Sequence, residues 1–145
     1  MTIVSSETLH ASCVAFDRRA VLIEGRSGAG KSDLALRLID RGAILVSDDY
    51  TVLKRQAKQL FATSPATIAG KIEVRGIGII EMPYVDDVAV ALLVELEGEV
   101  ERLPAEVQTR RIAGIDVPVL RLSGHHASAP IKIELALKRL EGSIR

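Results

Sequence analysis

The chain has 145 residues, of which 48% are hydrophobic and 26% charged, and its nineteen Lys and Arg balance nineteen Asp and Glu. This length and composition exclude a disordered chain and suit one folded domain with a buried core. Because the charge is balanced and the aromatic residues are two Phe and two Tyr, we expect neither the basic field nor the stacking platform that nucleic-acid binding requires.

The sequence also bears on compartment. Cys13 is the single cysteine, which excludes an internal disulfide and suits a reducing compartment. Residues 1–10 lack the basic start and apolar stretch of a secretion signal. The longest apolar run, Val88–Val94, is too short to span a bilayer. We therefore expect a cytoplasmic protein that does not enter a membrane.

The first elements in chain order are a strand, a glycine-rich loop, a helix and a second strand. Ala20–Ile23 is a short apolar run that predicts a buried strand after the charged turn at residues 17–19. From Lys31 onwards apolar residues recur at helical spacing, and Gly42 stands where the glycine that ends a helix belongs. Ile44–Val46 predicts a second buried strand. This order implies a parallel pair of strands joined by a right-handed crossover.

The remainder of the chain alternates between short β-like segments and turn residues. The segments are Tyr50–Lys54, Gln59–Phe61, Lys71–Val74, Val88–Leu96 and Val117–Leu122. A further helix is expected at Pro130–Leu140, which has proline in its first turn and apolar residues on one face. The sequence contains no repeat, low-complexity stretch or obvious linker. We therefore predict an α/β fold, with a single domain over residues 1–145 and a mixed β-sheet.

Residues 25–32 match the phosphate-loop (P-loop) pattern G-x-x-x-x-G-K-[ST] between a predicted strand and a predicted helix. They are Gly25, Arg26, Ser27, Gly28, Ala29, Gly30, Lys31 and Ser32. Glycines let backbone N–H groups converge on phosphate oxygens, and the following helix directs its positive end at them. Lys31 reaches the β- and γ-phosphates, and the Ser32 hydroxyl binds Mg²⁺. We predict a site for a nucleoside triphosphate and Mg²⁺, and we expect Lys31 to face solvent in the free protein.

Two acidic residues, Asp48 and Asp49, follow the second predicted strand. Ligands of open α/β sheets bind outside the carboxyl ends of the strands, so this pair should face the phosphates. One carboxylate could hold Mg²⁺, directly or through water, and the other could accept a proton from an attacking hydroxyl. The residues alone do not say which aspartate does which.

Several other polar residues carry little information by themselves. His10 near the N-terminus is typical of a solvated side chain, and Arg102 is typical of an exposed arginine. Residues 73–80 (EVRGIGII) are consistent with a strand that runs into a tight turn. His125 and His126 lack the rest of a metal-ligand set, so we expect a flexible loop there.

Taken together, these pieces resemble the catalytic domain of the HPr kinase/phosphorylase family, bacterial enzymes that phosphorylate a serine of the phosphocarrier protein HPr. The resemblance covers roughly Leu9–Leu140 and extends more weakly through residues 101–103. It rests on an ordered series that comprises His10, the P-loop, residues 34–42 (LALRLIDRG), Asp48–Asp49 and residues 73–80. The fold implied is a P-loop domain like that of the phosphoenolpyruvate carboxykinases. Family members usually form hexamers.

The resemblance implies a role for each matching residue. ATP would be the phosphoryl donor and Mg²⁺ the cofactor, with Ser32 and Glu73 as metal ligands. Asp49 rather than Asp48 would accept the proton of the substrate serine. His10 would orient or polarise that centre, and Arg102 would stabilise the charge of the transferring phosphoryl group.

The sequence departs from the family pattern in two places. Family members usually carry a separate N-terminal domain, for which we find no room before His10, so the sequence resembles the short forms of some Gram-negative bacteria. The family's Pro-Val-x-x-Gly-Arg-Asn stretch, which is tied to phosphorolysis and subunit contact, has no clean counterpart in residues 120–130 (LRLSGHHASAP). We therefore expect a competent kinase and a poor phosphorylase.

Two other classes of function compete with this interpretation. A small-metabolite kinase commonly needs an arginine-rich lid over the phosphates, and the sequence offers only Arg110 and Arg111. A nucleotide-sensing module without catalysis would need the P-loop alone. A GTP-driven switch is disfavoured, because the sequence lacks an Asn/Thr-Lys-x-Asp segment that reads guanine.

Overall fold

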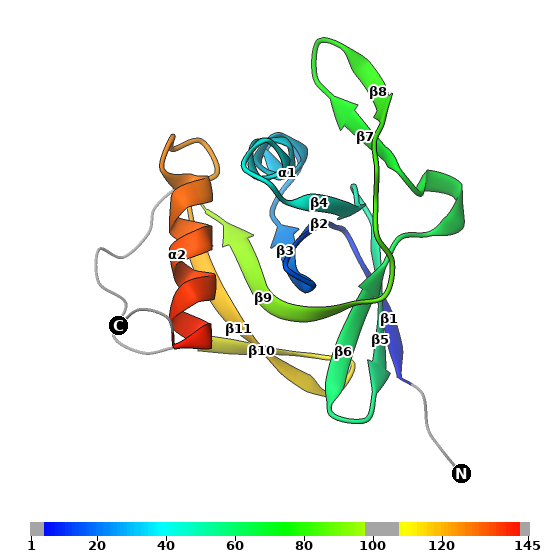
Figure 1. The fold of residues 1–145 in the computed structure, drawn as a ribbon, viewed down its shortest axis with the longest axis vertical. Helices are drawn as coiled ribbons and strands as arrows, with labels where there is room; N and C mark the ends of the chain where they lie inside the picture. Colours follow the sequence, from blue (N-terminus) through cyan, green and yellow to red (C-terminus); the bar gives the residue numbers. More distant parts are fainter. Residues whose placement is uncertain (1–4, 98–107, 143–145) are drawn as a thin grey trace.

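The computed structural model describes residues 5–97 and 108–142, which form one curled mixed sheet, a projecting hairpin and two helices (Figure 1). The helices are α1 (Lys31–Asp40) and α2 (Ala129–Glu141), with a short 3-10 turn at Ala66–Ile68. The strands up to the hairpin are β1 (Ser6–Leu9), β2 (Ala11–Phe16), β3 (Arg19–Glu24), β4 (Ile44–Ser47), β5 (Thr51–Gln56) and β6 (Gln59–Thr63). The remaining strands are β7 (Lys71–Val74), β8 (Gly78–Glu81), β9 (Val88–Leu96), β10 (Gln108–Ile112) and β11 (Ile115–Leu122).

The sheet is organised around β9, the longest strand. Its order is β1-β5-β6-β9-β3-β2-β4, and β11 also pairs with β9 and carries β10 beyond it. Strands β3 and β11 both run parallel to β9, whereas the other neighbours in the sheet are antiparallel. The carboxyl ends of β3, β9 and β11 therefore lie at one edge. This mixed α/β architecture confirms the predicted fold class.

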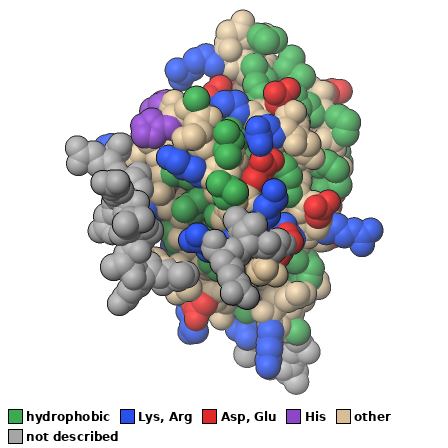
Figure 2. All heavy atoms as spheres, turned by 60° about the vertical axis from the view of Figure 1, so that its left-hand side comes forward, with side chains coloured by type: hydrophobic (Ala, Val, Ile, Leu, Met, Phe, Trp, Pro, Cys, Tyr) green, Lys and Arg blue, Asp and Glu red, His purple; other side chains and the backbone are tan. Residues whose placement is uncertain are grey.

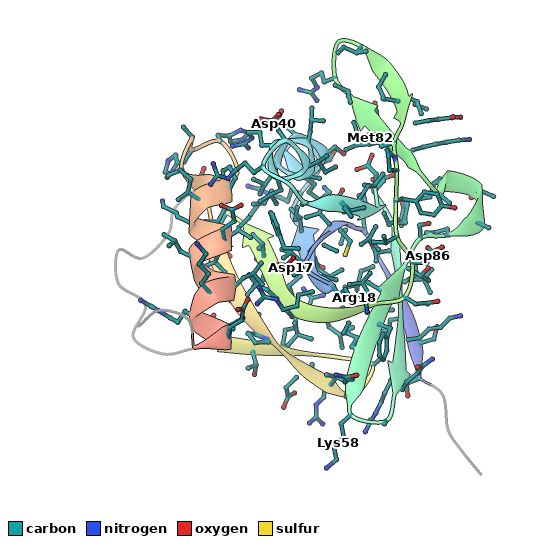
Figure 3. The ribbon with its side chains drawn as sticks, in the orientation of Figure 1. Asp17, Arg18, Asp40, Lys58, Met82 and Asp86 are labelled. Carbon is teal, nitrogen blue, oxygen red and sulfur yellow. The ribbon has the colours of Figure 1, made fainter. Side chains whose placement is uncertain are left out.

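The position of β2 corrects the prediction that the two strands on either side of α1 are direct neighbours in the sheet. Strands β3 and β4 are parallel, as expected, but they are not hydrogen-bonded neighbours, because β2 lies between them and is antiparallel to both. A tight turn at Asp17 and Arg18 joins β2 to β3, and both residues have positive φ (48° and 63°), as a two-residue hairpin turn requires. Figure 3 labels these two residues.

The two faces of the sheet pack into separate apolar clusters. Along β3, Val21 and Ile23 point to the cluster beneath the helices, whereas Ala20 and Leu22 point to the cluster inside the curl of the sheet. This alternation follows from the two-residue period of a strand. Because both faces are covered, the strand appears in the sequence as an unbroken apolar run.

The predicted helices form where expected. Helix α1 ends with Gly42 at φ 110°, and the N–H groups of Gly42 and Ala43 donate to the carbonyls of Ile39 and Leu38. This is the hydrogen-bond pattern of a glycine-terminated helix. No helix within the described residues has the length and apolarity needed to cross a membrane.

Strands β7 and β8 form a two-stranded hairpin of their own, which projects from the rest of the molecule at the top of Figure 1. The sequence predicted β7 and a tight turn after it, but not the return strand. The hairpin places Glu73, on β7, opposite Ile79. Its buried Ile72 belongs to the cluster beneath the helices, so the hairpin is anchored beside α1.

Candidate active site

The glycine-rich loop connects the carboxyl end of β3 to the first residue of α1. Gly28 and Gly30 adopt left-handed backbone conformations, with φ of 83° and 93°. Side chains rarely adopt that region, which explains the glycines. A Cβ on Gly25 would lie 3.1 Å from the Cβ of Leu96, so β9 packs closely against the start of the loop. The loop therefore sits at the edge where the parallel strands end, with the amino end of α1 directed into it.

Lys31 does not face solvent, and that expectation was wrong. Its side chain folds back over the loop and is 9% exposed. The Nζ atom donates to the carbonyl oxygens of Gly25, at 2.8 Å, and Arg26, at 3.2 Å. An ammonium group binds backbone carbonyls in this way because burial without a partner is costly. Lys31 is thus tied to the backbone at the start of the glycine loop.

Asp48 is a buried carboxylate, 5% exposed, that joins three parts of the fold. Its Oδ1 accepts hydrogen bonds from Ser32 Oγ at 2.6 Å and Ser12 Oγ at 2.8 Å. Its Oδ2 accepts one from the backbone N–H of Glu73 at 3.0 Å. These donors come from α1, β2 and β7. The position of this carboxylate is therefore strongly fixed.

Asp49 has the opposite environment, with a side chain that is 59% exposed. Its Oδ1 lies 2.7 Å from Nε2 of His10, and the His10 ring stacks on Tyr50 with centroids 4.9 Å apart. The backbone of Asp49 has a φ of 70°, uncommon for a residue with a side chain. The two aspartates are neighbours in sequence, but the Asp48 carboxylate is buried and hydrogen-bonded, whereas the Asp49 carboxylate is accessible.

A cavity of about 390 Å³ brings the predicted residues together. We call it the smaller cavity. It is lined by part of the glycine loop and by predicted site residues from four separate segments: His10, Lys31, Ser32, Asp49 and Glu73. Asp48 adjoins it through its hydrogen bond to Ser32. Arg102 lies outside the described residues. The roles assigned to these residues stay predictions.

A larger cavity, of about 700 Å³, also borders the glycine loop, along Gly25 to Ala29. Three carboxylates line it at the ends of β3 and β9: Glu24, Glu95 and Glu97. Two arginines hold them. Arg110 pairs with Glu24, and Arg121 lies 3.2 Å from Glu95. Hydrogen bonding to Glu24 raises the pKa of Arg110 above its ordinary value. The wall of this cavity is therefore acidic but largely neutralised.

The loop between β11 and α2 borders both cavities. Arg37 of α1 donates to the carbonyl oxygens of Gly124 and, at 3.1 Å, of His126. A Cβ on Gly124 would lie 2.8 Å from the carbonyl oxygen of Ala29, so this loop touches the glycine loop directly. His125 lines both cavities. Figure 2 shows histidine side chains at the upper left of the face that it draws. Contacts with α1 hold a segment for which the sequence predicted a flexible loop.

Sequence reasoning missed two residues of this region, Ser12 and His125. A serine inside the apolar run of β2 was a usable signal, because a buried hydroxyl needs a partner. The signal for His125 was its position just after β11, at the edge where β3 also ends. It could be read only once β3 and β11 were known to flank β9.

The residues around the smaller cavity fit a magnesium ion in their chemistry. Mg²⁺ takes oxygen ligands, and proteins usually hold it through one or two carboxylates together with substrate phosphates and waters. Ser32 and Glu73 line the cavity, and Asp48 is hydrogen-bonded to Ser32. Among the described residues, no three His, Cys, Asp or Glu side chains gather into a ready-made metal cluster.

Comparison with known proteins identifies the family. Residues 2–138 match the family model described as the HPr Serine kinase C-terminal domain. An HPr kinase/phosphorylase from Chlorobium luteolum is 39% identical over an alignment of 127 residues, with a coverage of 78% of this chain and 38% of that protein. Another, from Caldicellulosiruptor bescii, is 37% identical over 126 residues, covering 78% of this chain and 40% of that protein. The chain thus spans less than half the length of these curated relatives.

The fold has a close counterpart among solved structures. The structure described as the Hpr(Ser) kinase/phosphatase from Coxiella burnetii superposes with a TM-score of 0.81 and 32% sequence identity. The match covers 94% of this chain and 92% of that one. The further likeness to phosphoenolpyruvate carboxykinases stays a prediction. By family match, sequence identity and fold, the chain belongs to the HPr serine kinase C-terminal domain family, as the resemblance in its sequence predicted.

Proposed function

We propose that residues 1–145 form a catalytic domain that transfers the γ-phosphate of ATP, with Mg²⁺, to a serine of an HPr-like phosphocarrier protein. One observation carries the proposal: a phosphate-type loop and an accessible Asp49–His10 pair face the same cavity. The names of the relatives support HPr as the acceptor class. By resemblance we also propose a cytoplasmic homo-oligomer, a hexamer in the family pattern.

The glycine loop and Lys31 bind the triphosphate in this proposal. Phosphate oxygens offer the Lys31 ammonium stronger partners than the carbonyls of Gly25 and Arg26, which it contacts in the free protein. The backbone N–H groups at the start of α1 supply further donors. The larger cavity suits the nucleoside, because it borders the same loop and its size is typical of a ligand pocket.

Ser32 and Glu73 hold the metal, and Asp48 supports them. Mg²⁺ held there would neutralise charge that develops on the phosphoryl group during transfer. Asp48 accepts from Ser32 Oγ and from the Glu73 N–H. It therefore fixes both proposed ligands relative to each other, and it could also hold the ion through water. Asp48 is an unsuitable acceptor for a substrate proton, because it is buried and three donors already occupy it.

Asp49 takes the proton of the acceptor serine. A serine hydroxyl is a weak nucleophile, so a carboxylate that accepts its proton assists as the new bond forms. The exposed Asp49 side chain is accessible to a residue of another protein, and His10 holds one of its oxygens. Arg102 would stabilise the transferring phosphoryl group, a proposal that rests on the resemblance alone.

The competing small-metabolite kinase would need free arginines to close over the phosphates. Arg110 is paired with Glu24 and Arg111 lies 3.1 Å from Asp116. The two arginines that the sequence analysis considered for a lid thus have carboxylate partners. This observation counts against a lid built from that pair.

Transfer of labelled phosphate tests the proposed function. The purified chain is incubated with γ-labelled ATP, Mg²⁺ and an HPr-like carrier, and mass spectrometry then identifies the modified residue. We expect one phosphate on the carrier serine and none on a carrier in which that serine is replaced by alanine. If the carrier stays unmodified while a small metabolite is phosphorylated, the small-metabolite kinase is correct. If neither is modified although ATP binds, the chain is a nucleotide sensor.

Asp48→Asn should raise the Mg²⁺ requirement rather than abolish transfer. The substitution keeps the shape but weakens the hydrogen bond from Ser32 and removes a negative charge beside the proposed metal ligands. Changes to residues that orient metal ligands typically cost about 10- to 100-fold in metal affinity. The Mg²⁺ concentration that gives half-maximal transfer is the measurement. An unchanged value would contradict the role given to Asp48.

The altered segment at residues 120–130 should make the protein a poor phosphorylase. The arginine and asparagine of the family stretch that is tied to phosphorolysis have no clean counterpart in it, and this region contains His125 and His126. Serine-phosphorylated carrier is incubated with inorganic phosphate, and loss of the phosphate from the carrier is followed over time. Dephosphorylation should be slower than the forward reaction at comparable substrate levels, and equal rates would show the inference to be wrong.

A further inference from the structure

Ser12 connects the two aspartates of the site from the strand beneath them. It lies in β2 and is fully buried. Its hydroxyl donates to Asp48 Oδ1 at 2.8 Å and accepts from the backbone N–H of Asp49 at 3.2 Å. The hydroxyl thus donates its single proton to Asp48 and accepts a hydrogen bond from Asp49 through a lone pair. Among the described residues, no other side chain has a hydrogen bond to both.

The backbone around Asp49 needs such support. The N–H of Tyr50 donates to the carbonyl of Asp48 at 2.8 Å, which closes a three-residue turn around Asp49 at a φ of 70°. Tight turns of this kind with positive φ are rare and strained. A strained residue costs about 1–3 kcal/mol and persists only where surrounding contacts impose it. The bond from the Asp49 N–H to Ser12 is such a contact, as is the bond from Ser47 Oγ to the Tyr50 carbonyl.

We infer that Ser12 is a positioning residue that gives the two neighbouring aspartates their different roles, an inference that rests on the proposed phosphotransfer function. By donating to Asp48, it keeps that carboxylate buried behind Ser32. By accepting from the Asp49 N–H, it maintains the turn that leaves the Asp49 side chain exposed beside His10. Ser12 does not line either cavity, so it acts through the aspartates rather than on the substrate.

The hydrogen bonds of Ser12 also bear on the proposed metal site. Ser32 and Ser12 both donate to Asp48 Oδ1. A Ser32 hydroxyl that ligated Mg²⁺ would do so through an oxygen lone pair and would keep its proton for Asp48. Ser12 and the Glu73 N–H fix the carboxylate that orients Ser32 in this way. Removing the Ser12 hydroxyl should therefore weaken metal binding as well as the turn at Asp49.

The test compares four replacements by kcat, by the Mg²⁺ concentration for half-maximal activity and by thermal stability. Ser12→Ala should lower kcat and raise the Mg²⁺ requirement, each by about 10- to 100-fold, the range for residues that orient ligands. ATP binding without Mg²⁺ should change little, because Lys31 and the loop are untouched. Ser12→Thr and Ser12→Val have nearly the same shape and crowd the buried site equally. Thr should restore most of the activity, and Val should not.

Thr51→Val is the matched control. Thr51 is also fully buried, and its hydroxyl donates to the Ala11 carbonyl at 2.8 Å rather than to either aspartate. The Thr51→Val variant should be less stable than the parent but should keep its kcat and its Mg²⁺ requirement. The inference would be overturned if Thr51→Val and Ser12→Ala changed kcat and the Mg²⁺ requirement equally. It would also be overturned if Ser12→Ala folded and had the kcat and the Mg²⁺ requirement of the parent. If Ser12→Ala does not fold, kcat and the Mg²⁺ requirement are compared between Ser12→Thr and Ser12→Val, and equal values for these two variants would overturn the inference.

A second readout separates this inference from the proposed function. If the parent phosphorylates no carrier, the proposed function fails. The role of Ser12 is then judged by calorimetry of ATP binding with and without Mg²⁺, and by the Asp49 backbone angle from NMR coupling constants. Ser12→Ala should lose Mg²⁺-dependent affinity and shift that angle away from positive φ. Parent-like values for both would overturn the inference.

Discussion

Replacing Asp49 with asparagine should lower kcat by about 10²- to 10⁴-fold, the usual scale for acid–base catalysis. Asparagine has nearly the same shape and tolerates the positive φ of this position. It can still contact His10, but it cannot accept the proton of a serine hydroxyl. ATP and Mg²⁺ should bind as before, because Asp49 is not among the proposed phosphate or metal ligands. Initial rates of carrier phosphorylation at saturating ATP provide the measurement.

Asp116→Asn is a suitable control for that variant. Asp116 is likewise an exposed carboxylate with one basic partner, Arg111, at 3.1 Å, but it lines neither cavity. Its replacement should leave kcat unchanged. If Asp48→Asn proved inactive while Asp49→Asn only required more Mg²⁺, the roles of the two aspartates would be exchanged. Full activity of both variants would refute a carboxylate base in this pair.

Lys31→Ala should abolish productive ATP binding. The variant loses a charged donor to the phosphates, and hydrogen bonds to charged groups contribute about 1.5–3 kcal/mol each. Two such bonds correspond to about 3 kcal/mol or more, so affinity should fall by more than about 100-fold. The variant also loses the two hydrogen bonds from Lys31 to the carbonyls of Gly25 and Arg26, so a small decrease in thermal stability should accompany the effect. Calorimetry with ATP and circular dichroism measure the two quantities.

Lys132→Ala provides the comparison for this variant. Lys132 is an exposed lysine on α2 that lines neither cavity, and its removal changes the net charge of the protein by the same amount. It should bind ATP as the parent does. Unchanged ATP affinity in Lys31→Ala would remove the basis for assigning residues 25–32 to phosphate binding.

Local features of the site were predictable from the sequence because their determinants are adjacent in the chain. The glycine loop, the start of α1 at Lys31 and the end of α1 at Gly42 depend on residues only a few positions apart. The position of β2 between β3 and β4 was not predictable in this way. A strand's apolar pattern indicates that it is buried but not which strand is its neighbour.

The different environments of Asp48 and Asp49 were likewise outside the reach of local pattern. Both follow the same strand, and their surroundings are set by partners far away in sequence. Ser12 and Glu73, which donate to Asp48, are 36 and 25 residues from it. His10, which contacts Asp49, is 39 residues away. Only the resemblance to a known family favoured Asp49 as the base, and the exposure of its side chain supports that choice.

The left-handed backbone of Asp49 limits which amino acids this position can tolerate. Among residues with side chains, Asn, Asp and His are several-fold enriched at positive φ, whereas branched and bulky residues are strongly disfavoured. Of these tolerated residues, only aspartate has a carboxylate. Glutamate would keep the acidic group but lacks the short polar side chain that favours this conformation. The turn therefore restricts the choice of residue before catalysis does, and protein-engineering libraries that vary position 49 should recover aspartate more often than glutamate among folded variants.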